Sequence, residues 1–197
     1  MLKWFSMAIL AAVSALPVSA SSVLKVDFDQ LSRMARHVVS GQVTAVEAEE
    51  AANGYIYSTV TIDVQRAAPA QLQGREYTFR MLGGETSKGR LMIQGMPRFE
   101  VGDRVALFLS SKPSAVFGPT VGLWQGVFFV ETNPATGQDV ILTSERQPVM
   151  SVRENRLVRG RPLPKGDLGL KALSAEGGVS ALTADRFFEE VRLRRGE

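Results

Sequence analysis

The residue types that most often carry catalysis or bind metal ions are scarce in this chain of 197 residues. It has one histidine, His37, and no cysteine, whereas a zinc site needs three or four ligands drawn from histidine, cysteine and carboxylates. His37 is also the one imidazole that could activate a serine or threonine nucleophile, and no Gly-x-Ser-x-Gly turn accompanies it. We therefore interpret His37 as structural, and we predict no catalytic residue, no metal site and no cofactor.

Acidic side chains form two clusters, Asp27/Asp29 and Glu47/Glu49/Glu50. Two carboxylates that flank a glycosidic bond at a set separation can hydrolyse it, and carboxylate oxygens also bind calcium. The chain has no Asp-x-Asp-x-Asp-Gly calcium loop. We interpret the first pair as a helix cap and the second cluster as the solvated end of a hairpin.

A glycine-rich stretch over residues 83–89 contains Lys88. It lacks the Gly-Lys-Ser/Thr ending of a P-loop. It also lies between two predicted strands, so no helix N-terminus follows to hold a phosphate. We predict a turn here rather than a nucleotide site.

The segment Met96-Pro97-Arg98-Phe99 has the composition of a binding site. It places an arginine beside a long apolar residue, a rigid proline and an aromatic ring, and arginine and aromatic residues are frequent anchors of protein interfaces. We expect Trp124 to lie nearby. Met96, Arg98, Phe99 and Trp124 are therefore the candidate binding residues. The alternative is that Met96 and Phe99 close one end of a barrel while Trp124 fills the core, as large apolar side chains usually do.

The first twenty residues have the pattern of a secretory signal peptide. Lys3 precedes an uncharged apolar run over residues 7–16, and the small residues Val18 and Ala20 stand where a signal peptidase requires them. The run is far shorter than the roughly 20 residues that cross a bilayer. We therefore expect cleavage after Ala20, export to the periplasm or the outside of the cell, and no membrane span in the mature chain. An exported protein without cysteine has no disulfides, so its stability must come from packing.

Short strands separated by turns dominate the rest of the pattern. Residues 37–45 and 55–64 alternate between polar and apolar side chains, and Asn53-Gly54 between them is typical of a hairpin turn. The apolar run 105–109 indicates a strand that is covered on both faces. Further strands are predicted over residues 76–82, 90–94, 104–110, 120–125, 126–132, 139–143, 149–152 and 156–158.

Two helices and a linker complete the predicted organisation. A short helix over residues 27–36 begins at an aspartate cap, and a last helix follows Thr183 with Phe187, Phe188 and Val191 on one face. We expect a signal peptide (1–20), a β domain (21–159), a linker rich in glycine, proline and charge (160–178) and a C-terminal helix (179–197). Turn signals every 8–12 residues favour an all-β fold, namely a small OB-like barrel or sandwich with additional hairpins and a helix at each end.

The order of these segments resembles a group of uncharacterised exported bacterial proteins. The resemblance covers roughly residues 22–143 and rests on the strands 37–43 and 57–64, the pair Gly83-Gly84, the stretch 95–103, the strand 105–109 and the segment 122–126. It implies export but no assigned activity. More distantly, the strand order resembles the netrin-like, OB-type module of tissue inhibitors of metalloproteinases. Those inhibitors place a disulfide-locked N-terminal cysteine at the protease zinc, and no residue of this chain corresponds to it.

The charge of the chain gives little information about its binding partner. The chain has a formal net charge of +3, and its basic side chains gather in residues 146–171, which we interpret as a solvated arginine-rich edge. Export argues against a nucleic-acid partner. We therefore predict an exported, non-catalytic binding or accessory module. The sequence does not identify its ligand, and an envelope or extracellular protein is one candidate partner. Two alternatives stay open: a hydrolase or lyase that uses carboxylates on envelope polymers, and a regulator of a secreted protease.

Overall fold

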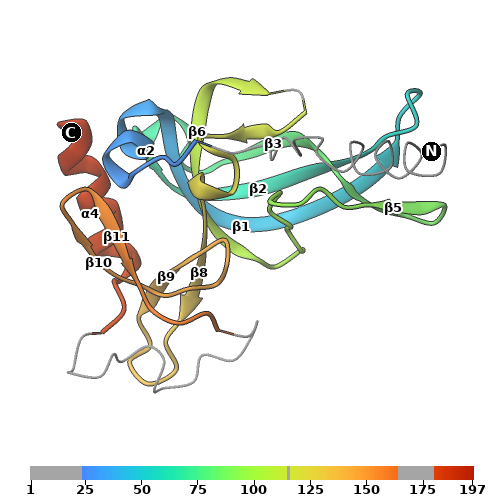
Figure 1. Ribbon diagram of the computed structural model, residues 1–197. Helices are drawn as coiled ribbons and strands as arrows, with labels where there is room; N and C mark the ends of the chain where they lie inside the picture. The colour runs from blue at the N-terminus through green and yellow to red at the C-terminus, as the bar shows by residue number, and fades with distance from the viewer. Residues whose placement is uncertain (1–23, 115, 164–179) are drawn as a thin grey trace, which may run out of the picture.

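The computed structural model describes residues 24–114, 116–163 and 180–197 (Figure 1). The predicted signal peptide and most of the predicted linker lie outside these residues. The fold is mostly β, which confirms the predicted all-β class. Its helices are α2 (Phe28–Met34) and α4 (Ala184–Arg195), with short 3-10 helices η1 (Ala70–Leu72) and η2 (Leu123–Gly126). Its strands are β1 (Ala35–Glu50), β2 (Ile56–Ala68), β3 (Arg75–Leu82), β4 (Gly84–Thr86), β5 (Gly89–Leu91), β6 (Arg104–Ser114), β7 (Gly118–Thr120), β8 (Val127–Thr132), β9 (Asp139–Thr143), β10 (Val149–Arg153) and β11 (Arg156–Arg159).

An antiparallel sheet of seven strands forms the centre of the molecule. Its order is β3-β2-β1-β6-β8-β9, with β7 paired to β6. In the described part of the chain this sheet is open, because β3 and β9 are its edges and do not close into a barrel. The hairpins β4–β5 and β10–β11 are separate two-stranded sheets.

The hairpin of β1 and β2 was the clearest local prediction, and it is confirmed. Its pairing runs from Val38 opposite Ala68 to Glu50 opposite Ile56. The hairpin is longer than expected, because residues 47–50 continue β1 as a strand instead of forming a loop. Only the first half of β1 also pairs with β6, so the distal half extends beyond the centre of the sheet.

The sheet buries an apolar layer on each face. In β6, Val105, Leu107 and Leu109 belong to one layer while Ala106 and Phe108 belong to the other. This arrangement confirms the prediction of a strand covered on both sides.

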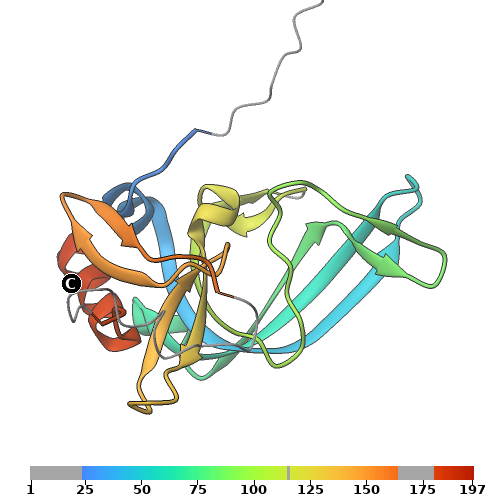
Figure 2. The ribbon, with the colours of Figure 1, turned by 60° about the horizontal axis from the view of Figure 1, so that its bottom comes forward.

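The helices α2 and α4 cover one face of the sheet (Figure 2). Asp27 caps α2 in a capping box with Gln30, and Thr183 caps α4. Phe187, Phe188 and Val191 of α4 are fully buried, as predicted. Helix α2 ends earlier than expected, at Met34, because Ala35 already has extended backbone and begins β1.

The other face is covered by a different set of elements. The β4–β5 hairpin lies against β1 and β2, and the crossover of residues 92–103 contributes Phe99 to the same apolar layer. This hairpin and the tip of β1–β2 lie at the end of the molecule opposite the two helices (Figure 1).

One predicted strand, over residues 120–125, is wrong. Only Thr120 belongs to a strand there, and the chain then forms η2. Hydrogen bonds within the turn replace sheet pairing. The Thr120 hydroxyl donates to the Leu123 carbonyl at 3.0 Å, and the backbone N–H of Gln125 donates to the Gly122 carbonyl at 3.1 Å.

Candidate functional site

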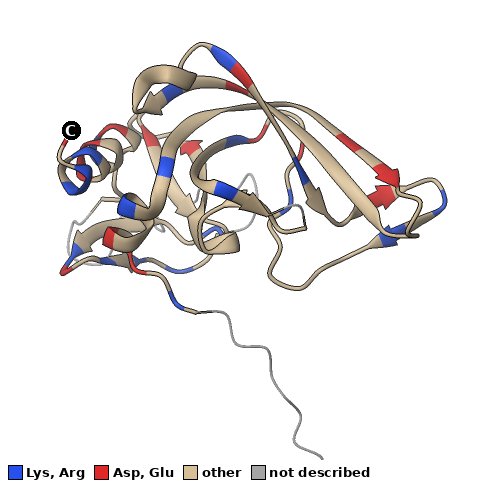
Figure 3. Cartoon of the chain, turned by 90° about the horizontal axis from the view of Figure 1, so that it is seen from above, with Lys and Arg blue, Asp and Glu red and all other residues tan. Residues whose placement is uncertain are grey.

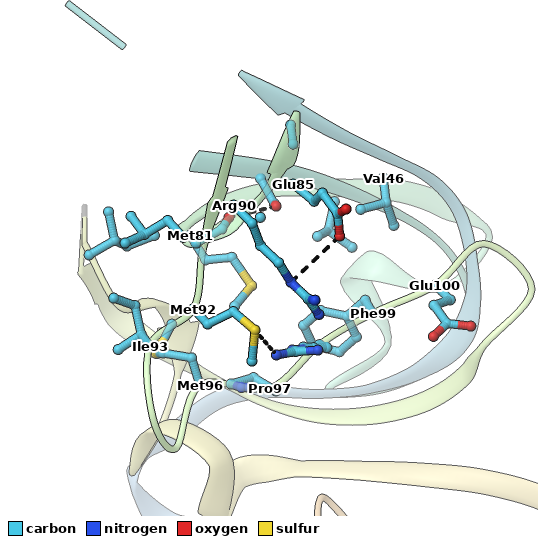
Figure 4. A pocket seen from close by; sticks show the side chains of 18 residues that line it. Val46, Met81, Glu85, Arg90, Met92, Ile93, Met96, Pro97, Phe99 and Glu100 are labelled. Carbon is cyan, nitrogen blue, oxygen red and sulfur yellow. Dashed lines mark hydrogen bonds and ion pairs between the residues drawn. The ribbon is translucent and has the colours of Figure 1, made fainter. Parts of the chain in front are cut away.

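A pocket of about 330 Å³ lies at the end of the sheet where the distal half of β1, β2 and β3 meet the β4–β5 hairpin and residues 92–100. Its inner wall is apolar, since Val60, Met81 and Phe99 are almost fully buried and line it. The side chains of Met81, Met92 and Phe99 converge on this space, and Arg90 extends toward it (Figure 4). The pocket therefore joins an apolar interior to a charged rim, which carries the acids Glu85 and Glu100 as well as Arg90 and Arg98.

The pair Gly83-Gly84 makes this arrangement possible. Gly84 has φ +147°, and a Cβ built on it would lie 2.5 Å from the Ser58 Oγ and 3.1 Å from the Ala48 Cβ. Only glycine allows β4 to approach β1 and β2 so closely. The Ser58 hydroxyl donates to the Gly83 carbonyl at 2.7 Å and fixes the turn. The turn predicted over residues 83–89 is shorter than expected, because residues 84–86 and 89 belong to the paired strands β4 and β5 and only Ser87 and Lys88 form the turn between them. The bend at Gly83-Gly84 places this hairpin as one wall of the pocket.

Phe99 anchors the opposite wall in the core. Its ring meets the ring of Phe79 edge to face, with centroids 5.7 Å apart. Met96 is half-buried and packs against the same apolar layer. Both residues line the pocket, so they serve the apolar layer and the pocket together.

Arg98 lies between these two residues in sequence but is exposed. Its Nη2 donates to the Met92 Sδ at 2.7 Å, and a thioether is a weak acceptor. Among residues 24–114, 116–163 and 180–197, no carboxylate forms an ion pair with Arg98. Most of the hydrogen-bonding capacity of this guanidinium is therefore open to a ligand.

Arg90 provides a second guanidinium at the rim. Its Nε lies 3.5 Å from the Glu85 Oε2, and both side chains are more than half exposed. An exposed pair at this distance contributes little stability, so a ligand anion can compete with Glu85 for Arg90. Figure 3 shows acidic and basic residues interspersed over this end of the molecule.

Trp124 is not among the residues that line the pocket. A Cβ built on Gly95 would be 2.8 Å from the Trp124 Cζ3, so the indole ring lies directly against the turn that precedes Met96. The structure therefore brings Met96, Arg98 and Phe99 to one pocket and places Trp124 as a support. Sequence reasoning missed Arg90, Met81 and Met92.

The acidic clusters have local partners instead of facing one another. Asp27 caps α2, Asp29 lies 3.0 Å from Arg33, and Glu49 lies 2.9 Å from Arg80. In the described parts of the chain, no group of three or more histidine, cysteine or acidic side chains could hold a metal ion.

His37 lies on β1, near the end of the sheet that the helices cover. It is half-buried, and its Nε2 accepts a hydrogen bond from the Arg36 Nε at 3.3 Å. Burial lowers the pKa of His37, and the positive charges of Arg36 and Arg195 lower it further. His37 does not line the pocket.

Comparison of the chain with protein-family models, with curated proteins and with solved structures finds no match. Among the described helices, none has the length and apolar character needed to cross a bilayer.

Proposed function

We propose that this chain is an exported, non-catalytic binding module that holds an envelope or extracellular protein through the pocket of Met96, Arg98 and Phe99. One observation carries the proposal. An exposed guanidinium with no carboxylate partner in the described chain stands at the mouth of a preformed apolar pocket. Arginine beside buried apolar surface is the usual composition of a binding hot spot.

The polar groups of the pocket favour binding over catalysis. Its lining contains no histidine, and its one hydroxyl, that of Ser58, already donates to the Gly83 carbonyl. A nucleophile needs a base within hydrogen-bond reach. Glu85, an acid on the lining, is 70% exposed and lies 3.5 Å from the Arg90 Nε, so it faces a guanidinium rather than a nucleophile.

Affinity capture from the native culture medium tests the proposal. The mature wild-type protein, Arg98→Ala and Arg153→Ala are immobilised, and the captured proteins are identified and titrated by calorimetry. Arg153 is the matched control, because it is an exposed arginine on the β10–β11 hairpin. We expect Arg98→Ala to weaken a captured partner by roughly thirtyfold, which is about 2 kcal/mol, and Arg153→Ala to leave it unchanged. Equal affinity of all three proteins for every captured partner would contradict the proposal.

A further inference from the structure

The charge of the pocket rim decides which ligands it excludes. Met81, Met92 and Met96 all line the pocket, and thioethers are soft ligands that select monovalent copper. The Met92 sulfur, however, already accepts a hydrogen bond from the Arg98 guanidinium, and Arg90 extends into the same space (Figure 4). A metal cation at these thioethers would face two positive charges. Glu85 and Glu100 also line the pocket, but Glu85 lies 3.5 Å from Arg90 and Glu100 has an interaction of its own, so the guanidinium of Arg98 favours an anion at the rim.

The apolar interior further limits the kinds of anion that the pocket can bind. Val46, Val60 and Phe99 line the inner part of the pocket, where an anionic sugar or a bare inorganic anion would lose its hydration without gaining hydrogen bonds. A ligand that fits both parts has an apolar group at one end and an anionic group at the other. The planar guanidinium fork matches the geometry of a carboxylate.

The size of the pocket sets an upper limit on the apolar group. About 330 Å³ is near the lower limit of pockets that hold drug-sized molecules, which is room for a large side chain together with the backbone next to it. The methionine walls can adapt to side chains of different shape, because methionine is unbranched and flexible.

We infer that the pocket captures the C-terminal residue of a partner polypeptide. An apolar terminal side chain enters between Met81, Met96 and Phe99, and the terminal carboxylate is bound by Arg98 with the help of Arg90. This inference rests on the proposed function and specifies which part of the protein partner is bound.

Paired peptides test the inference on the whole mature protein. The probe is the fluorescein-labelled peptide Gly-Gly-Ser-Ser-Leu with a free C-terminal carboxylate, compared with its C-terminal amide and with a peptide that ends in lysine. Affinity is measured by fluorescence anisotropy. Loss of one charge-assisted hydrogen bond weakens binding by roughly tenfold or more. We expect that loss for the amide, and a comparable loss for the peptide that ends in lysine.

Variants of Arg98 test whether the difference in affinity between the acid and the amide arises at the rim of the pocket. Arg98→Ala should remove most of the difference in affinity between the free acid and the amide, because only Arg90 then remains, and should leave the amide itself unchanged. Arg98→Lys should keep more of the difference. Arg153→Ala should behave as the wild type does. Circular dichroism and the urea midpoint of each variant show that the fold is intact. Equal binding of acid and amide by the wild type overturns the inference, and so does an acid–amide difference that is as large in Arg98→Ala as in the wild type.

Three further outcomes test this inference, and the first and the last of them separate it from the proposed function. If a captured partner depends on Arg98 but loses nothing when its last three residues are removed, the C-terminal inference fails and the binding module stands. If decanoate displaces the peptide and binds more tightly than it does, the anion comes from a lipid and the inference is overturned. If the peptides show the predicted pattern but no captured protein depends on Arg98, the ligand chemistry is supported and the proposed protein partner fails.

Discussion

The ring of Phe99 meets the ring of Phe79 edge to face, with centroids 5.7 Å apart and an angle of 83° between the planes. Phe79 belongs to β3, while Phe99 belongs to a crossover with no regular secondary structure. Such aromatic pairs add about 0.5–1.5 kcal/mol beyond the burial of their area. This contact therefore holds the crossover, which contains Arg98 and forms a wall of the pocket, against the sheet.

The first prediction contrasts Phe99 with its neighbour. Phe99→Ala should lower the free energy of unfolding by about 3–5 kcal/mol, because Phe99 is 7% exposed and truncation leaves a cavity. Arg98→Ala should change it by less than about 0.5 kcal/mol, since its side chain is exposed and forms no ion pair in the described structure. Urea denaturation of both variants measures the difference. If Arg98→Ala unfolds the protein, the Arg98 guanidinium stabilises the fold, and the pocket is then a structural feature and not a binding site.

The second prediction concerns the contact between Gly95 and Trp124. Gly95 has φ +79°, so alanine there costs roughly 1–2 kcal/mol in backbone conformation alone, and its Cβ would also press on the indole ring. Gly137 is the matched control, since its φ is +68° but nothing lies within 4 Å of a Cβ built there. Gly95→Ala should destabilise the protein more than Gly137→Ala and should shift the tryptophan emission. Identical urea midpoints and spectra of the two variants would contradict the contact.

Sequence patterns predicted most of the fold because most of it depends on local alternation. The β1–β2 hairpin, the strand buried on both faces and the two capped helices each have a period or a cap that can be read within fifteen residues. The strand predicted around Trp124 is wrong for the same reason, because it was inferred from local alternation alone. Leu123 and Trp124 resemble part of a strand, but the hydrogen bonds that turn the chain there depend on Thr120 and Gln125.

The candidate site was only partly predictable. Met96, Arg98 and Phe99 adjoin one another in the chain, so their composition was visible. Met81 lines the pocket from β3, whereas Arg90 comes from β5 and reaches the pocket only because the chain turns back at Gly83-Gly84. The contribution of Arg90 depends on how the β4–β5 hairpin folds back over the sheet, and no local pattern encodes that.

The third prediction concerns the junction between the two helices. The Arg195 Nη1 donates to the carbonyl oxygens of Ser32 at 3.1 Å and Ala35 at 2.6 Å, and its Nη2 donates to that of Arg36 at 3.3 Å. These bonds tie the end of α4 to the point where α2 passes into β1. Arg195→Ala should lower the free energy of unfolding by about 1.5–3 kcal/mol, the range for hydrogen bonds to a charged group.

The control for this prediction is Arg192→Ala in the same turn of α4, because Arg192 is exposed. It should leave stability within about 0.5 kcal/mol of the wild type. Hydrogen exchange should show faster opening of α4 in Arg195→Ala only. Equal exchange in both variants would mean that the apolar face of α4 holds the helix without help from Arg195.

The last prediction is a dependence of stability on pH that arises from His37. Burial, followed by the positive charges of Arg36 and Arg195, lowers the pKa of His37 below its ordinary value of 6.5. Protonation would also destroy the acceptor that binds the Arg36 Nε. Between the lowered pKa and 6.5 the unfolded chain therefore binds more protons than the folded chain, so stability falls as the pH falls through this range. Above pH 6.5 the contribution is complete.

A second titrating group lies in a separate range and serves as the control. A hydrogen bond from Arg104 lowers the pKa of Asp139 below its ordinary value of 3.8, so the stability that Asp139 contributes is present above 3.8 and is lost only at lower pH. Urea denaturation from pH 8 to pH 5 should show a loss of stability on the acid side in the wild type and in Asp139→Asn. The loss should be largely absent in His37→Gln, because His37 is the one histidine of the chain. If the slope persists in His37→Gln, another group titrates in this range and His37 is not the source.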